Sequence, residues 1–169
     1  MNNAPNYRRS ITTGFSFGLT SGIITTLGLM VGLNSSTHSM LAVVGGVLTI
    51  AIADAFSDAF AMHITEEVRN AKATQEIWTA TFSTLMFKFI TAITFLIPLL
   101  LVSPGSLTLD AAIIASIAWG LLLITIFNYF LARKEKAPAW KIIGEHLIIA
   151  IIVVVLANLA GSWINAAFG

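Results

Sequence analysis

The chain has 169 residues, of which 57% are hydrophobic and 10% are charged, and its formal net charge is +1. A soluble domain carries about 25% charged residues, so a soluble globular enzyme is excluded. Intrinsic disorder is excluded too, because disordered chains are poor in apolar residues. There is no cysteine, and therefore no disulfide or thiolate ligand. The composition predicts an integral membrane protein whose partner is the lipid bilayer, and the net charge indicates no nucleic-acid partner.

Five stretches are long and apolar enough to cross a bilayer, which takes about 20 mainly apolar residues. They cover residues 10–33, 40–64, 78–102, 109–132 and 142–166. The connections between them leave no room for a separate soluble domain. We therefore expect residues 1–169 to form a single all-α domain of five transmembrane helices. The first stretch is too long for the apolar core of a signal peptide, so we expect it to be retained.

Lysine and arginine fall on one side of the membrane if the chain crosses it five times. The residues on that side are Arg8, Arg9, Arg69, Lys72, Arg133, Lys134, Lys136 and Lys141. The remaining basic residue, Lys88, lies inside the third span. Because cytoplasmic loops carry the excess of basic residues, the N-terminus is predicted to be cytoplasmic and the C-terminus external. The small size of the chain favours the plasma membrane of a prokaryote.

The first span carries glycines at a regular interval. Gly14, Gly18 and Gly22 are four residues apart, and Gly28 and Gly32 follow. Small residues at this spacing let two helices approach closely in lipid. The second helix belongs either to the same bundle or to another copy of the chain, and the spacing favours neither. The second possibility predicts a homodimer with a seam along Gly14, Gly18 and Gly22.

Two carboxylates, Asp54 and Asp58, lie within the second span. A charge at this depth costs about 2.5–3.5 kcal/mol on insertion scales and therefore indicates a function. The two residues are four positions apart and share a helix face, which Met62 and Glu66 continue toward the cytosol. At a rise of about 1.5 Å per residue, this row covers roughly 18 Å from near the membrane centre to the cytoplasmic surface. We interpret the row as a path for a cation.

Polar residues of other spans are predicted at similar depths. Lys88 lies level with Asp54, and Ser21 lies near the middle of the first span. Glu145 lies about one turn inside the fifth span, near the depth of Met62. These three residues are predicted to support the cation path or to carry protons along it.

The residue types of the row indicate its cargo. Asp58 and Met62 are predicted to be metal ligands, Asp54 a deeper ligand or a proton carrier, and Glu66 the first carboxylate reached from the cytosol. Carboxylates are hard ligands and the thioether of Met62 is soft, a mixture that favours Fe²⁺ or Mn²⁺ over Mg²⁺ or Ca²⁺. A dication that displaced protons from the two coupled aspartates would link metal transport to proton transport. The metal is a substrate, and no resident cofactor is expected.

Two alternatives to a metal transporter stay open. In the first, a buried ion pair between Asp54 and Lys88 merely fixes helix packing, Asp58 is neutral, and the protein is a scaffold or a subunit of a larger assembly. In the second, the protein is a proton-coupled carrier of a small organic solute. An enzyme is not predicted, because the sequence contains no phosphate-binding loop, zinc-protease motif or nucleophile elbow.

Three segments resemble parts of the helices of the vacuolar iron transporter family. Residues 17–33, FGLTSGIITTLGLMVGL, resemble its first helix, which runs roughly DGLVTTLGLVAGL. Residues 53–62, ADAFSDAFAM, resemble its second helix, roughly ADAISMGLGE, and residues 97–100, IPLL, match the end of its third. The resemblance implies a dimeric exporter of Fe²⁺ or Mn²⁺ driven by proton antiport. It also implies that the first two helices line the metal path at the dimer interface.

The chain departs from the pattern of that family in its polar residues. Ser21 stands where the family has an aspartate, so this carboxylate is missing. Asp58 and Met62 stand where the family has methionine and glutamate, so the two ligand types occur in swapped order. Lys88 has no counterpart in the pattern. The cytoplasmic metal-binding domain of the family is also missing, because the second connection runs only from Glu66 to Ile77.

Overall fold

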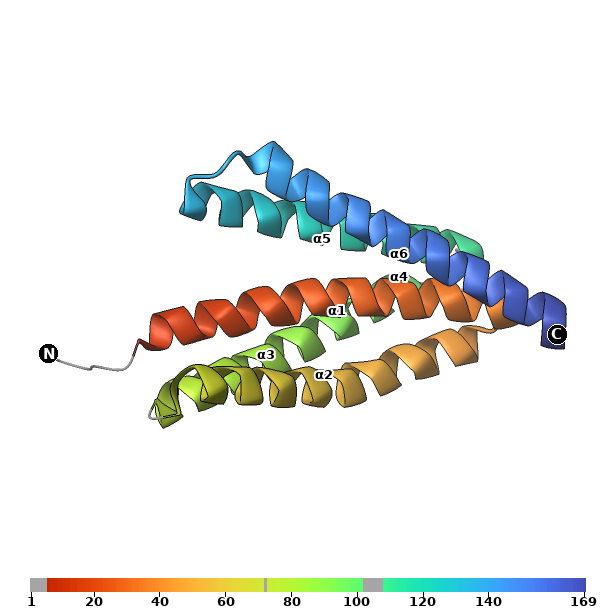
Figure 1. Ribbon diagram of the computed structural model, residues 1–169. Coiled ribbons are helices and arrows are strands. Elements are labelled where there is room, and N and C mark those ends of the chain that lie inside the picture. The colour runs from red at the N-terminus through yellow and green to blue at the C-terminus, as the bar shows by residue number, and fades with distance from the viewer. Residues whose placement is uncertain (1–5, 72, 102–107) are drawn as a thin grey trace, which may run out of the picture. The chain divides into compact units, whose positions relative to one another are not determined.

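The computed structural model describes residues 6–71, 73–101 and 108–169, and these residues are helical apart from short connections (Figure 1). The helices are α1 (Tyr7–Thr37), α2 (Met40–Asn70), α3 (Thr74–Thr94), α4 (Leu96–Leu100), α5 (Leu109–Glu135) and α6 (Ala139–Phe168). Within the described residues, five segments are long and apolar enough to cross a membrane, and α3 and α4 together make the third. The predicted class, an all-α membrane protein with five spans, is confirmed at this level.

Most helices extend beyond the predicted spans, because apolar composition marks only the part of a helix that lies in hydrocarbon. α1 begins early, where the side chain of Asn6 accepts a hydrogen bond of 3.1 Å from the backbone N–H of Arg9 and caps the helix. α5 begins where the Thr108 hydroxyl accepts a bond from the Ala111 N–H. It ends at Lys136, whose φ of 53° is left-handed.

The third predicted span, residues 78–102, is not one continuous helix. α3 ends at Thr94 and α4 begins at Leu96. Pro98 explains the interruption, because proline has no N–H to donate to the carbonyl of Thr94 and its ring crowds that carbonyl. The predicted end of this span at residue 102 lies outside the described residues, as does Lys72.

The chain divides into two compact units. One comprises the residues up to Gly22 together with Leu48–Ile93, and the other comprises Ile23–Val47 and Thr94–Gly169. α1 and α2 contribute to both units, because the boundaries fall inside these helices. The N-terminal half of α1, the larger C-terminal part of α2 and α3 up to Ile93 meet in the first unit, which contains Asp54, Asp58 and Lys88.

Within the first unit, the glycines of α1 face α3. A Cβ built on Gly14 would lie 2.5 Å from the carbonyl oxygen of Ala80, and one on Gly18 would lie 2.6 Å from that of Thr84. Side chains do not tolerate contacts below 3.0 Å with backbone atoms. Glycine is therefore required at both positions for α1 and α3 to lie this close.

This packing corrects the predicted dimer seam. Gly14, Gly18 and Gly22 are covered by α3 of the same chain, so a second copy has no access to them. In the second unit, Gly28 and Gly32 face α6, where an added Cβ would lie 3.0 Å from Val153 and 3.6 Å from Ala157 respectively. The glycine spacing therefore serves packing inside one chain, and the homodimer stays a prediction without a defined interface.

Candidate functional site

Three helices of the first unit each place a polar side chain near the helix middle. Ser21 comes from α1, Asp54 and Asp58 come from α2, and Lys88 comes from α3. We call these four residues the Lys88 cluster. Because α2 and α3 are long apolar helices, the cluster lies far from the polar ends of both.

The ammonium group of Lys88 binds all three of the other side chains. Its Nζ lies 2.6 Å from Asp54 Oδ2 and forms an ion pair with Asp58 Oδ2. It also donates a hydrogen bond of 2.9 Å to Ser21 Oγ. An ammonium has three N–H donors, and here it has three oxygen neighbours. The ammonium of Lys88 therefore has one polar oxygen neighbour for each of its N–H groups.

Ser21 connects the lysine to one of the carboxylates. Its hydroxyl accepts from Lys88 and donates a hydrogen bond of 2.6 Å to Asp58 Oδ2. One carboxylate oxygen of Asp58 thus receives two donors, and hydrogen bonds to charged groups are the stronger kind. Ser21 is thus part of the cluster, although it contributes no charge of its own.

The close approach of α1 and α3 brings Ser21 within reach of the lysine. A Cβ on Gly18 would lie 3.1 Å from the backbone nitrogen of Lys88, and a Cβ on Gly22 would lie 3.3 Å from its carbonyl oxygen. The two glycines flank Lys88 along α1, so the helices meet backbone to backbone at this level. Glycine packing and the polar cluster are therefore parts of one arrangement.

The formal charge of the cluster is one negative, since two carboxyl groups surround one amino group. The Lys88 side chain is only 2% exposed, whereas those of Asp54 and Asp58 are 26% and 19% exposed. The ammonium is thus enclosed, whereas both aspartate side chains are partly exposed, although Asp54 Oδ2 itself is buried. An enclosed charge in a membrane is tolerated only when it is paired, which these contacts achieve.

The predicted ligand row does not form a single coordination sphere. Met62 is buried one turn beyond Asp58, and the Glu66 side chain is 7% exposed and bound to Arg69 at 2.9 Å. Glu66 lies about 12 Å along the helix from Asp58. Among residues 6–71, 73–101 and 108–169, no three histidine, aspartate or glutamate side chains gather as a potential metal site. The row is therefore a series of separate positions along α2.

Glu145 and Lys88 were both predicted to lie near the cation path, and the structure places Lys88 beside Asp54 and Asp58. Glu145 is exposed on α6 in the second unit, and its supporting role stays a prediction. Lys88 was expected level with Asp54 and lies there, but its contact with Asp58 was missed. The signal was present in the sequence, because aspartates four residues apart on one face lie within reach of a single long side chain.

His63, on the same helix as the cluster, has a packing role. Its Nδ1 lies 3.1 Å from the Thr81 hydroxyl, which itself donates to the carbonyl of Ile77 at 2.8 Å. The imidazole ring also stands edge-on to Trp78, with ring centroids 4.6 Å apart. These contacts fasten α2 to α3.

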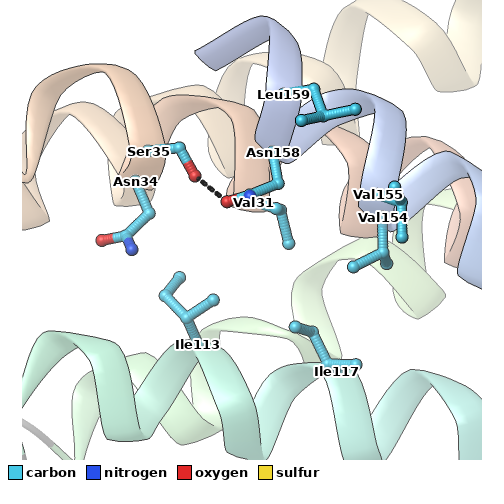
Figure 2. Close-up of a pocket in the computed structure, with 9 residues that line it drawn as sticks. All are labelled: Val31, Asn34, Ser35, Ile113, Ile117, Val154, Val155, Asn158 and Leu159. Atoms are coloured by element: carbon cyan, nitrogen blue, oxygen red, sulfur yellow. Dashed lines mark hydrogen bonds between the residues drawn. The ribbon is translucent and has the colours of Figure 1, made fainter. Parts of the chain in front are cut away.

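The second unit contains a pocket of about 260 Å³ lined by α1, α5 and α6 (Figure 2). Its polar side chains are Asn34, Ser35 and Asn158, and Ser35 donates a hydrogen bond of 2.6 Å to Asn158 Oδ1. The other side chains of the lining are valine, isoleucine and leucine. None of the described lining residues is charged, so this pocket offers no ion pair to a cation.

Five apolar spans with a paired ammonium and two carboxylates near the middle of the helices define a multi-pass integral membrane protein. No family model, curated protein or solved structure matches the chain. The similarity to the vacuolar iron transporter family accordingly rests on the short motifs of α1, α2 and α4 alone.

Proposed function

We propose that the protein is a transporter of a divalent transition-metal cation, Fe²⁺ or Mn²⁺, and that Asp54 and Asp58 are its central ligands. The observation that carries the proposal is that these two carboxylates, one helical turn apart, already hold a single cation between them, the ammonium of Lys88. Two carboxylates on one helix face supply the negative charge and part of the oxygen ligand set that a dication needs in an apolar surrounding.

Neighbouring groups extend the ligand set. The hydroxyl of Ser21 lies against Asp58 and offers a further oxygen. Met62, one turn toward the cytoplasmic end of α2, offers a soft thioether along the same face. Glu66 is held by Arg69 at the end of the row. A hard and soft set of this kind favours Fe²⁺ or Mn²⁺ over Mg²⁺.

Direction and location follow from the charge pattern. From the one-sided distribution of basic residues we infer that the N-terminus and the connection between α2 and α3 are cytoplasmic, with Glu66 toward the cytosol. We infer export from the cytosol across a prokaryotic plasma membrane, coupled to proton entry through the carboxylates.

The test is metal flux in proteoliposomes loaded with a metal-sensitive dye. The purified chain is expected to move Fe²⁺ and Mn²⁺ and to move Mg²⁺ far more slowly. Empty liposomes control for leakage. If none of these three ions moves faster than in empty liposomes, the proposal is wrong.

One observation favours a second candidate, a membrane scaffold. Lys88 donates hydrogen bonds to Ser21 and Asp58, forms an ion pair with Asp54, and is enclosed, as expected of an ion pair that only joins α1, α2 and α3. A scaffold would transport none of the ions, and its cluster would matter for stability alone. Comparing flux and stability of the same variants therefore separates the two functions.

A further inference from the structure

We infer that Lys88 is a built-in competitor of the substrate cation, so that its ammonium and a dication are alternative occupants of the space between Asp54 and Asp58. The inference rests on the proposed function, because it concerns the regulation of the same site. It assigns Lys88 a role that the metal-binding interpretation of α2 leaves unexplained.

The contacts show that the ammonium takes the ligands a metal would need. Nζ lies 2.6 Å from Asp54 Oδ2 and binds Asp58 Oδ2, and it also binds Ser21 Oγ at 2.9 Å. These three oxygens are the ones that α1 and α2 direct to this point. A metal that binds them must displace the ammonium from at least one carboxylate.

Simultaneous binding is electrostatically unfavourable. A dication binds carboxylate oxygen at about 2.0–2.6 Å. A metal on Asp58 Oδ2 would therefore lie within roughly 5 Å of an ammonium held by that same atom. Like charges this close repel strongly in an environment of low dielectric constant. The lysine must move aside when the metal binds, and its four-carbon stem allows that movement.

Accessibility gives the competition a direction. Lys88 is enclosed, at 2% exposure, on the side of α3, while the side chains of Asp54 and Asp58 are partly exposed. An incoming cation thus meets the carboxylates first, and the ammonium rebinds from within when the metal leaves. Such a tethered cation weakens metal binding and prevents the empty site from being left with two unpaired carboxylates.

The test is equilibrium binding of Mn²⁺ to the full-length protein in detergent, followed by the electron paramagnetic resonance signal of free Mn²⁺. Lys88→Gln removes the competing charge and is expected to bind Mn²⁺ at least tenfold more tightly than the wild type. Lys88→Arg keeps the charge and should show no gain in affinity. Lys88→Gln combined with Asp58→Asn should lose the gain, because one of the two carboxylates is gone.

A second pair of variants carries the test if Lys88→Gln does not fold. Asp54→Asn leaves Lys88 paired with Asp58, and the double variant Asp54→Asn/Lys88→Gln leaves Asp58 without the ammonium. The double variant retains the wild-type net charge of the cluster and should bind Mn²⁺ more tightly than Asp54→Asn. The inference would be overturned if Lys88→Gln bound Mn²⁺ no more tightly than the wild type and the double variant bound it no more tightly than Asp54→Asn.

Failure of the inference and failure of the proposed function give different results. If the wild type transports Mn²⁺ but removal of Lys88 does not tighten binding, only the competition is wrong. If the wild type neither binds nor transports Mn²⁺ but Lys88→Gln binds it, the competition is supported and the transport function is wrong. If neither protein binds Mn²⁺, both are overturned.

Discussion

Lys88 Nζ lies 2.6 Å from Asp54 Oδ2 and joins two antiparallel helices, α3 and α2, at the middle of their lengths. The same ammonium also binds Asp58. Lys88 is therefore shared by both aspartates and does not form a pair with Asp54 alone. One lysine thus serves as the counter-charge of two carboxylates.

Removing the lysine is expected to destabilise the protein strongly. Lys88→Gln leaves Asp54 and Asp58 without a counter-charge, and breaking a buried pair costs about 3–5 kcal/mol. Adding Asp54→Asn to this variant should restore part of the loss, because it removes one of the two like charges. Thermal unfolding in detergent measures both effects, and additive losses in the double variant would contradict the shared pairing.

The glycines of α1 predict opposite effects of two alanine substitutions. Gly18→Ala places a Cβ 2.6 Å from the carbonyl oxygen of Thr84, and overpacking of this kind costs about 1–3 kcal/mol. Gly144→Ala on α6 meets nothing within 4 Å and should stabilise by about 0.5–1 kcal/mol through helix propensity. The two melting temperatures should therefore move in opposite directions from the wild type. Equal shifts would mean that α1 and α3 are not in backbone contact.

The sequence predicted the five spans and the shared face of Asp54 and Asp58, because apolar length and helical period are local properties. It did not predict which helix the glycines of α1 meet, since a spacing of four residues suits an internal contact and a dimer equally. In the structure, α3 packs against Gly14, Gly18 and Gly22. The position of Lys88 between both aspartates depends on that contact, so it also required the three-dimensional arrangement.

Two local features could have been predicted and were not used. Pro98 interrupts the third span for reasons that the sequence alone contains. Glu66 and Arg69 are three residues apart on one helix, a spacing that allows the ion pair observed at 2.9 Å. The pair partly neutralises the carboxylate that was expected to meet an arriving cation first.

The predicted topology is testable with single cysteines, since the chain has none of its own. A cysteine at Ala71, between α2 and α3, should be protected from a membrane-impermeant maleimide in intact cells. A cysteine at Ser162, near the end of α6, should react. Labelling of the Ala71 variant in intact cells would reverse the proposed orientation, and the direction of metal transport would reverse with it.

The central claim is that Asp58 holds the transported metal, and Mn²⁺ flux through Asp58→Asn in proteoliposomes tests it most directly. Glu67→Gln, an exposed residue on the same helix, is the matched control for loss of a carboxylate. We predict that Asp58→Asn reduces flux at least 100-fold while the protein remains folded and that Glu67→Gln transports like the wild type. A folded Asp58→Asn protein that moves Mn²⁺ at the wild-type rate would contradict the account.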